Sequence, residues 1–434
     1  MLIWGGLVLG LAQPALADAV KSTPWLGGVT TNSVYACLEA TNTTPATVDF
    51  GLTPAYGMSA TTEYTESTGS TYVHNVKLTG LLPNTQYYYR VTQGSSVSAG
   101  YSFYTAPLAG TPAHWGFAAD CRTNISTHNA VAGQIATHSP NMMVYGGDLC
   151  ATNSYSSWTS EWFVPNQNAL NAVSPFVNSP GNHEGWNSLT RAFTQAPAGD
   201  PDYFSFDYGD SHILVLNTQL SQSNGSPQWN FAAADLAAST AAWKIVTFHI
   251  SAYCAGGHGE NAAMVAMTQQ LFEPNGVDVV LTGHSHFYQH NLVNGIHHMV
   301  IGSFGAPLVT PSVGSYTVYT EKTYCFGIFE TTPSLLTLTT YRSDGSVIET
   351  IQILQVPGDA NQDGITNALD YVVVSNNYDT GTTWTEGDVN VDGAVNALDY
   401  VVISNNYGAS APEPATLALL AMGGLGLVLS RKRK

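Results

Sequence analysis

The sequence predicts a multidomain protein with an N-terminal β-sandwich, a central α/β domain and a small α module that contains a duplicated acidic loop. Three observations lead to this fold class. Short alternating runs fill residues 24–107, buried-strand runs mix with helix-like stretches through residues 112–354, and the acidic heptapeptide Gly358–Gly364 recurs at Gly387–Gly393. The length of 434 residues agrees, since a domain usually takes about 150 residues.

Composition excludes several classes of protein. Hydrophobic residues make up 44% of the chain and the mean hydropathy is near zero, which excludes a disordered chain and a multi-span membrane protein. Lys+Arg 12 against Asp+Glu 30 gives a net charge of −18, and the last four residues of the chain are all basic. Because so acidic a body repels a phosphate backbone, no nucleic-acid partner is expected. An anionic substrate would need a bound metal ion to reverse the local field.

Both ends of the chain resemble sorting signals. Residues 1–17 are mostly apolar and end in Ala15-Leu16-Ala17, which predicts a signal peptide; a buried N-terminal strand is the alternative. Pro412-Glu413-Pro414 precedes an apolar run and a basic cluster, so residues 412–434 resemble a PEP-CTERM sorting tail, with a plain membrane anchor as the alternative. We therefore expect an exported protein, at the cell surface or extracellular, whose tail contacts the membrane transiently.

Residues 24–107 predict a β-sandwich. Tyr72–Leu78 and Gln86–Val91 alternate polar with apolar residues, and the Leu82–Thr85 segment between them has turn composition. This stretch resembles a fibronectin type III domain, and it resembles the sandwich that precedes the catalytic domain in plant-type purple acid phosphatases. No catalytic constellation lies in it, so we expect a packing or spacer module.

In residues 112–354, reactive side chains follow the predicted strands. These strands are Trp115–Ala119, Met142–Tyr145, His212–Leu216, Lys244–Phe248 and Val277–Leu281. In α/β folds, ligands collect beyond the carboxyl ends of the strands. The sequence therefore predicts a functional site at that edge.

Five motifs at predicted strand ends supply candidate metal ligands. They are Asp120-Cys-Arg122, Gly146-Gly-Asp148, Gly181-Asn-His-Glu184, His249 and Gly283-His-Ser-His286. Carboxylates, an amide oxygen and imidazoles together suit Fe, Zn or Mn rather than calcium. The glycines before Asp148, Asn182 and His284 let the backbone turn sharply and approach the metal.

This constellation resembles the calcineurin-like metallophosphoesterases, and among them the purple acid phosphatases. The resemblance covers about residues 112–350 and implies two packed mixed sheets flanked by helices. It also implies two transition-metal ions. Carried onto this chain, Asp148 bridges both ions, Asn182, His249 and His284 complete one site, and Asp120 and His286 belong to the other. His183 is the implied general acid, and His258 a substrate-pocket histidine.

The expected reaction is hydrolysis of a phosphate ester. Two cations about 3.5–4 Å apart can hold a bridging hydroxide as nucleophile and clamp the phosphoryl oxygens. A neighbouring imidazole then protonates the leaving group. We expect an acid phosphatase-like hydrolase of phosphomonoesters. There are two alternatives. One is a phosphodiesterase with the same metal site, and the other is a catalytically decayed cell-surface protein with a structural or binding role.

The chain departs from the family pattern at the first metal site. The wider family has Asp-x-His where this chain has Arg122, and purple acid phosphatases have a tyrosine where this chain has Ala151. Arg122 is either a bidentate phosphate clamp, which is how we class it among the catalytic candidates, or a salt-bridged loop residue. Cys121 and Cys150 lie beside the candidate ligands, and export favours a disulfide between them over metal ligation.

The duplicated loop has the oxygen-ligand spacing of an EF-hand loop. The candidate calcium ligands are Asp359, Asn361, Asp363, Ile365, Asn367 and Asp370, and then Asp388, Asn390, Asp392, Ala394, Asn396 and Asp399, with Ile365 and Ala394 offering backbone carbonyls. A loop followed by an apolar run, present twice in residues 357–408, resembles a type I dockerin and implies a cohesin-like partner. The alternative is a small surface domain that calcium merely stabilises.

Overall fold

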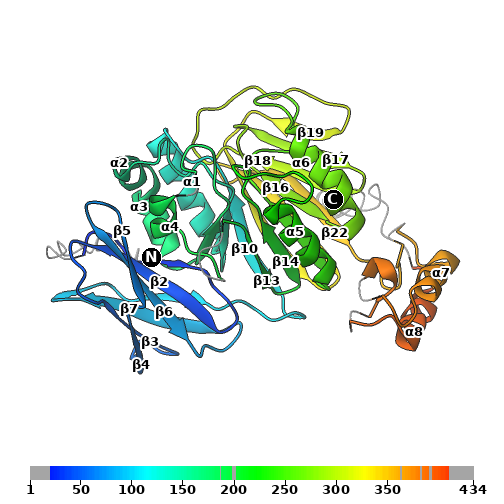
Figure 1. Cartoon of the computed structure of the whole chain (residues 1–434), viewed down its shortest axis with the longest axis horizontal. Helices are drawn as coiled ribbons and strands as arrows, with labels where there is room; N and C mark the ends of the chain where they lie inside the picture. The colour runs from blue at the N-terminus through cyan, green and yellow to red at the C-terminus, as the bar shows by residue number, and fades with distance from the viewer. Residues whose placement is uncertain are drawn as a thin grey trace, which may run out of the picture.

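The computed structural model describes residues 20–185, 187–197, 202–361, 364–381, 384–390 and 393–409, and in these residues the strands form three sheets. Figure 1 shows the sandwich at one end, two helix-covered sheets in the middle and a small helical module at the other end. The predicted signal peptide and the predicted sorting tail lie outside the described residues. Within the described residues, no helix is long and apolar enough to cross a membrane.

The N-terminal part is the predicted β-sandwich. One of its layers contains β1 (Trp25–Gly27), β2 (Ser33–Ala40), β5 (Tyr64–Ser67) and β6 (Tyr72–Thr79). The other contains β3 (Thr47–Gly51), β4 (Met58–Thr61), β7 (Gln86–Gln93), β8 (Ser96–Val97) and β9 (Tyr101–Tyr104). The two strands predicted from alternation are β6 and β7.

The sandwich continues directly into the central domain. Strand β1 pairs in parallel with β12 (Phe176–Asn178), so one ten-stranded sheet runs in the order β22-β21-β20-β10-β11-β12-β1-β2-β6-β5. A Cβ on Gly27 would lie 2.9 Å from Oε1 of Gln195, which explains the glycine at this junction. The Tyr89 hydroxyl donates to the carbonyl of Ala172 across the same boundary. The sandwich is therefore a packing partner of the central domain and not a detached spacer.

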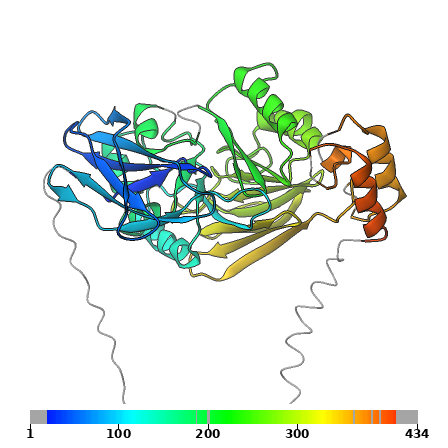
Figure 2. The ribbon, with the colours of Figure 1, turned by 90° about the horizontal axis from the view of Figure 1, so that it is seen from below.

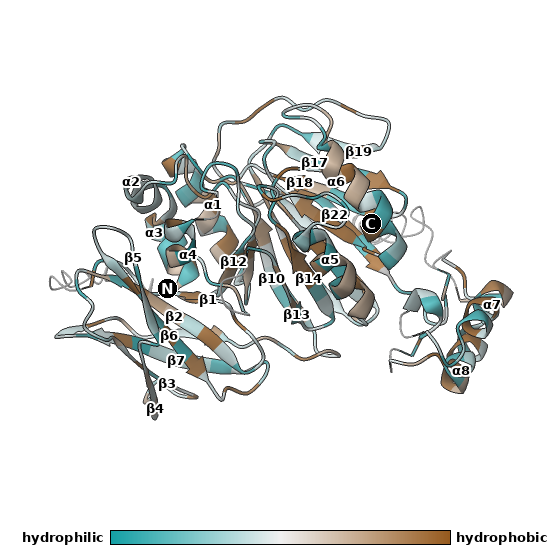
Figure 3. Ribbon diagram, in the orientation of Figure 1, coloured by the Kyte–Doolittle hydropathy of each residue, from teal (hydrophilic) through white to brown (hydrophobic). Residues whose placement is uncertain are grey.

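The central domain consists of two sheets packed face to face. The ten-stranded sheet contributes β10 (Ala113–Ala118), β11 (Met143–Tyr145), β20 (Cys325–Thr332), β21 (Leu335–Arg342) and β22 (Val347–Leu354). The second sheet, of seven strands, contains β13 (Phe204–Tyr208), β14 (Ser211–Val215), β15 (Trp243–Thr247), β16 (Val279–Thr282), β17 (Tyr288–Val293), β18 (Ile296–Ile301) and β19 (Thr317–Glu321). Apolar residues of both sheets, Phe117 and Ile245 among them, form one buried core. Hydrophobic colour accordingly concentrates on these strands in Figure 3.

Helices cover the outer face of each sheet. The first sheet is covered by α1 (Ile125–His138), α3 (Pro165–Asn171) and α4 (Ser188–Phe193), and the second by α5 (Pro227–Ala238) and α6 (Ala262–Met267). A short α2 (Tyr155–Ser157) runs into a π-helical turn at Trp158–Trp162. This arrangement confirms the predicted fold class.

Parallel pairing sets the position of the site. Strands β10, β11 and β12 run parallel in the first sheet, and β14, β15 and β16 run parallel in the second. The loops that leave their carboxyl ends carry the predicted motifs. The order of the strands thus brings together residues that are far apart in the sequence.

The C-terminal module consists of the duplicated loop and two helices. Helices α7 (Ala368–Asn376) and α8 (Ala397–Asn406) each follow one loop and begin with a capping box. The Tyr371 hydroxyl contacts the Ser404 hydroxyl, and the Tyr400 hydroxyl contacts that of Ser375, both at 2.7 Å. The two repeats therefore pack against each other symmetrically. Figure 2 shows the module at the end of the molecule opposite the sandwich.

His212, on β14, makes stability depend on pH. Its Nδ1 lies 2.7 Å from Oδ1 of Asp207 and its Nε2 lies 2.8 Å from Oδ2 of Asp235. Burial lowers the pKa of His212, but the hydrogen bonds and charges of the two aspartates outweigh it and raise that pKa to about 9. The resulting stabilisation is complete below the unfolded-state pKa of about 6.5 and is lost as the pH rises through about 9. We expect a loss of up to about 3 kcal/mol over that window.

Thermal unfolding of the wild type and of His212→Gln between pH 6 and 10 measures this effect, in a range that brackets both pKa values. The wild type should lose stability across the window. The variant should be less stable at low pH and should lack that loss. If the stability of both proteins changes with pH in the same way, His212 is not the cause of the loss of stability.

Candidate metal centre

Three of the predicted ligands stand on backbone in the left-handed region. Asp120, Asp148 and His284 follow strands β10, β11 and β16 with φ of 62°, 54° and 67°. Left-handed backbone is uncommon for residues other than glycine and persists where the surrounding structure holds it. These turns aim side chains from three different strands at one place.

Two glycines let the loops approach one another. A Cβ on Gly181 would lie 2.2 Å from Oδ1 of Asp148, and a Cβ on Gly283 would lie 2.3 Å from Oδ2 of Asp120. Both distances are far below a van der Waals contact, so no larger residue fits either position. Gly181 and Gly283 therefore let their loops pack directly against Asp148 and Asp120, while the approach of the backbone to a metal stays a prediction.

His249 lies at the centre of the predicted ligand set. Its Nε2 is 3.1 Å from Oδ1 of Asn182, 3.3 Å from Oδ1 of Asp148 and 3.3 Å from Nδ1 of His284. The His249 side chain is fully buried. The structure thus brings together all four residues that the sequence placed in one metal site.

Backbone carbonyls orient the rings of two of the histidines. Nδ1 of His249 donates to the carbonyl of Gly146 and Nδ1 of His286 donates to the carbonyl of Pro307, at 2.7 and 2.8 Å. With Nδ1 bound to a carbonyl, Nε2 is the ring atom of each histidine that is directed at the centre. This is the arrangement that metal-binding histidines adopt.

The donor set fits a transition-metal ion. Ligand atoms of Asp120, Asp148 and His249 all lie within 4.8 Å of one another, and all three residues are buried. Oδ1 of Asp120 is a buried oxygen without a hydrogen-bond partner, although its Oδ2 accepts from the amide of His284. Burial raises the pKa of Asp120 above its usual value. A bound cation would offset the cost of burying this carboxylate.

Asp148 has a different electrostatic environment. Burial raises its pKa, but the positive charge of His249, a hydrogen bond from that ring and the amide of His183 outweigh burial, and the pKa of Asp148 falls below its usual range. The amide of His183 donates to Oδ1 of Asp148 at 3.0 Å. Asp148 is therefore held as a carboxylate, ready to bind a cation.

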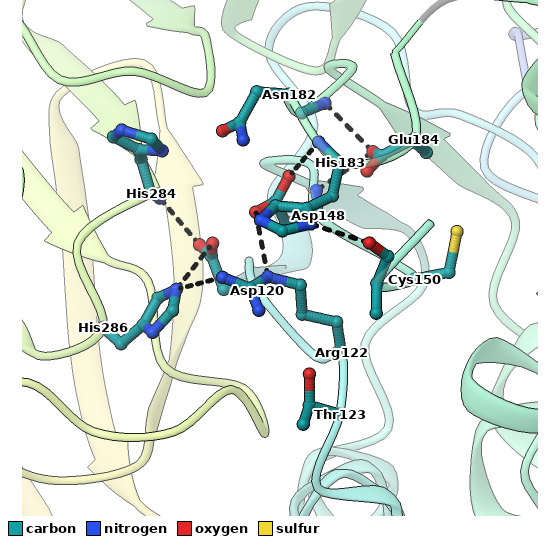
Figure 4. A network of polar contacts seen from close by, with 12 residues as sticks. Asp120, Arg122, Thr123, Asp148, Cys150, Asn182, His183, Glu184, His284 and His286 are labelled. Carbon is teal, nitrogen blue, oxygen red and sulfur yellow. Dashed lines mark hydrogen bonds and ion pairs between the residues drawn. The ribbon is translucent and has the colours of Figure 1, made fainter. Parts of the chain in front are cut away.

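Arg122 lies between predicted ligands (Figure 4). Its Nε donates to Oδ2 of Asp148 at 3.2 Å, and its Nη2 lies 3.3 Å from Nε2 of His286. Nε2 of His286 also lies 3.5 Å from Oδ1 of Asp120. The predicted first-site residues Asp120, Asp148 and His286 are thus together, with a guanidinium among them.

Two further histidines flank the centre. Nδ1 of His183 donates to the carbonyl of Ala151 at 2.7 Å, and its Nε2 lies 3.7 Å from Oδ2 of Asp148. The His258 ring lies 4.1 Å from the His284 ring between centroids, and the amide of His258 donates to Oγ of Ser285. Both side chains adjoin the predicted ligands, and about a third of the His183 side chain (32%) is exposed.

Two glutamates that sequence reasoning missed hold the loops. Oε1 of Glu184 accepts from the amides of Asp148 and Gly181, both at 3.0 Å, and burial together with the charge of Asp148 raises the pKa of Glu184 to about 7. Oε2 of Glu161 accepts from the amides of Thr123 and Ala151. Glu184 is the last residue of the Gly181-Asn-His-Glu184 motif, which could have indicated it. Glu161 lies in the π-helical turn at Trp158–Trp162, and no sequence signal marks Glu161.

The predicted disulfide is absent. All five cysteines lie within the described residues, and each is a buried free thiol. Sγ of Cys121 donates to the carbonyl of Leu149 and Sγ of Cys150 donates to that of Thr152. Neighbouring strand ends bring the two residues near each other, but each thiol is directed to its own carbonyl. Burial raises the pKa of both thiols, which keeps them protonated and disfavours metal ligation.

The predicted calcium loops contain buried carboxylates. Asp359, Asp370, Asp388 and Asp399 are all buried, whereas Asp363 and Asp392 lie outside the described residues. Oδ1 of Asp370 accepts from the amide of Asn361, and Oδ1 of Asp399 accepts from that of Asn390. Asn367 and Asn396 cap helices α7 and α8 with their side-chain oxygens, so their role as ligands stays a prediction.

Comparisons with known proteins agree with this anatomy. Residues 116–288 match the family model of the calcineurin-like phosphoesterases, and residues 28–105 match the N-terminal domain of purple acid phosphatases. Residues 357–408 match the type I dockerin domain, and residues 410–434 match the PEP-CTERM protein-sorting motif.

Relatives among curated proteins are plant purple acid phosphatases. Purple acid phosphatase 23 of Arabidopsis thaliana is 25% identical over 71% of this chain and 74% of its own length. Purple acid phosphatase 15 of the same plant is 24% identical over 50% of this chain, and the match spans about half (49%) of that relative.

Two solved structures show the same fold. Purple acid phosphatase PPD1 from yellow lupin (Lupinus luteus) seeds aligns with a TM-score of 0.66 and 19% identity, over 77% of this chain and 74% of that one. PhoD aligns with a TM-score of 0.61 and 15% identity, over 78% of this chain and 94% of its own. In its sandwich, its paired sheets and the loops that hold the predicted ligands, the chain is similar to the purple acid phosphatase-like metallophosphoesterases, and it also carries segments that match a dockerin domain and a PEP-CTERM motif.

Proposed function

We propose that this protein hydrolyses phosphomonoesters at the described centre, with His183 as general acid. One observation supports the proposal above the others: the converging set of Asp148, Asn182, His249 and His284 has His183 directly beside it. A bound transition-metal ion supplies Lewis-acid polarisation of the phosphoryl group and a nucleophile that is active near neutral pH.

His183 is placed to donate a proton. Its Nδ1–H is committed to the carbonyl of Ala151, so Nε2 is the ring atom that faces the centre. The carboxylate of Asp148 lies 3.7 Å from that Nε2. Nε2–H can then be transferred to the leaving alkoxide oxygen as the P–O bond breaks.

Positive groups around the centre suit a phosphomonoester. A monoester can carry two negative charges where a diester carries one, and the guanidinium of Arg122 lies against the same carboxylate that binds the metal. Its free N–H groups can donate to phosphoryl oxygens, while the exposed ring of His258 contacts the substrate from the side of His284. The surrounding chain is acidic, so this local positive charge selects for the anion.

Paired assays test the proposed activity. The purified full chain, supplied with transition metal, should hydrolyse 4-nitrophenyl phosphate faster than bis(4-nitrophenyl) phosphate. Preference for the diester would replace the proposal by a phosphodiesterase with the same site. If neither ester is cleaved by metal-loaded protein, the domain is a decayed one with a structural or binding role.

The C-terminal regions indicate where this activity is delivered. We propose export to the cell surface or outside the cell, since the dockerin domain and the PEP-CTERM motif both belong to exported or surface-associated proteins. Equivalent apolar side chains of the repeat, Leu369 and Leu398, are exposed by 57% and 58%, as are Val372 and Val401 by 52% and 51%. Such matched exposed faces fit a cohesin-like partner.

Calcium should control the folding of this module. Four buried aspartates in two short loops repel one another unless a cation binds them, so chelation with EGTA is expected to unfold residues 357–408 and leave the central domain folded. Limited proteolysis with and without calcium follows both parts at once. Protection of the module in EGTA would contradict the prediction, and an unchanged proteolysis pattern of the central domain serves as the internal control.

A further inference from the structure

The guanidinium of Arg122 lies between Oδ2 of Asp148 and Nε2 of His286, two atoms that would bind one ion in the predicted first metal site. Nε is 3.2 Å from Oδ2 of Asp148, and Nη2 is 3.3 Å from Nε2 of His286. Figure 4 shows the side chain reaching between these two residues. Only 16% of it is exposed, so it is enclosed by the centre.

The loop that carries Arg122 is held rigidly. Thr123 has φ of 78°, which is strained for a β-branched residue. Its amide donates to Oε2 of Glu161 at 2.7 Å, and the amide of Ala151 donates to the same oxygen at 3.1 Å. One carboxylate therefore fixes both loops that border the first site. Ala151 offers only a methyl group, so this position contributes no side-chain oxygen there.

One ion is sufficient for the remaining ligands. Donor atoms of Asp120, Asp148 and His249 lie within 4.8 Å of one another, and Asn182 and His284 adjoin His249. Metal–ligand bonds of about 2.0–2.2 Å around a single ion produce this spacing. That ion would also serve Oδ1 of Asp120, which is buried and accepts no hydrogen bond, with Nε2 of His286 3.5 Å away.

Charge leads to the same conclusion. Among the predicted ligands and Arg122, two carboxylates, one guanidinium and one divalent ion leave a small net positive charge, and the buried carboxyl of Glu184 lies beside them. A second divalent ion would have to bind the same oxygen of Asp148 that Arg122 already contacts, at short range from a fixed cation and in a buried place.

We propose that Arg122 replaces the first metal ion, so that this centre binds one transition-metal ion and the guanidinium binds phosphoryl oxygens in place of the other. The family match implies a dinuclear centre, and this chain departs from it. The metal count stands independently of the reaction, whereas the phosphoryl contact rests on the proposed function.

Metal stoichiometry tests the proposal without using activity. The full chain is saturated with calcium to keep transition metal out of the dockerin loops, loaded with Zn²⁺ or Mn²⁺, desalted and measured by elemental analysis. We expect one transition-metal ion per wild-type chain and two in Arg122→His, which supplies the imidazole of the wider family. Arg122→Lys keeps the charge and should stay at one, with phosphate inhibition weakened about tenfold by loss of the bidentate contact. Arg90→His, an exposed exchange in the sandwich, should also stay at one.

The outcomes separate this inference from the proposed function. Two ions per wild-type chain would overturn it, as would one ion in both the wild type and a folded Arg122→His. One ion in the wild type and two in Arg122→His support it even if no ester is cleaved, and in that case only the proposed function fails. A wild-type chain that binds no transition metal would overturn both.

Discussion

Replacing His183 with alanine is expected to lower kcat for an alkyl phosphomonoester by about 10²–10⁴-fold, the usual contribution of a general acid. The reason is positional: Nε2 of His183 faces the centre while Nδ1 is held by the carbonyl of Ala151. Metal content should not change, because His183 is not among the converging donors. Turnover and elemental analysis on the same preparation check both statements.

The leaving group provides the control for His183. A nitrophenolate departs without a proton, so the loss in His183→Ala should be much smaller for 4-nitrophenyl phosphate than for an alkyl ester. His114→Ala removes a histidine from the far end of β10, where it bonds the carbonyl of His138, and should leave kcat unchanged for both substrates. An equal loss on both substrates in His183→Ala would indicate a structural role and contradict proton donation.

Much of the site could be predicted because its ligands occupy strand ends. The hydrophobic runs located the strands, and parallel pairing of β10 with β11 places their carboxyl ends at one edge, so Asp120 and Asp148 had to meet. His249 follows β15 in the second sheet, and it reaches them because the two sheets pack face to face. The glycine at 283, next to a ligand, signalled close packing, and the structure shows that no side chain fits there. These features are local, and a sequence records them directly.

Tertiary contacts account for what the sequence did not reveal. The pairing of β1 with β12, which fuses the sandwich to the central sheet, joins segments about 150 residues apart and leaves no periodic signal. Glu161 acts through backbone amides, and any loop sequence supplies those. The disulfide predicted between Cys121 and Cys150 was wrong because nearness of strand ends does not determine where a thiol points.

His249→Ala should abolish both metal binding and turnover. Nε2 of His249 is the atom closest to the other donors, at 3.1 Å from Asn182 and 3.3 Å from both Asp148 and His284. Loss of a group that merely orients a ligand weakens metal binding by about 10–100-fold, so loss of the ligand itself should cost at least about 10³-fold. Elemental analysis should then find almost no transition metal, and ester hydrolysis should fall below detection.

A buried histidine elsewhere separates this effect from damage to the fold. His290 on β17 is also buried and is bound by Glu349, but it lies outside the donor set, so His290→Ala should lower the unfolding temperature and keep the metal. Added imidazole can occupy the space left in His249→Ala and should restore part of both the metal content and the turnover. If His249→Ala binds metal fully without imidazole, the converging donors are not the metal site. The proposed location of the catalytic centre would then be wrong.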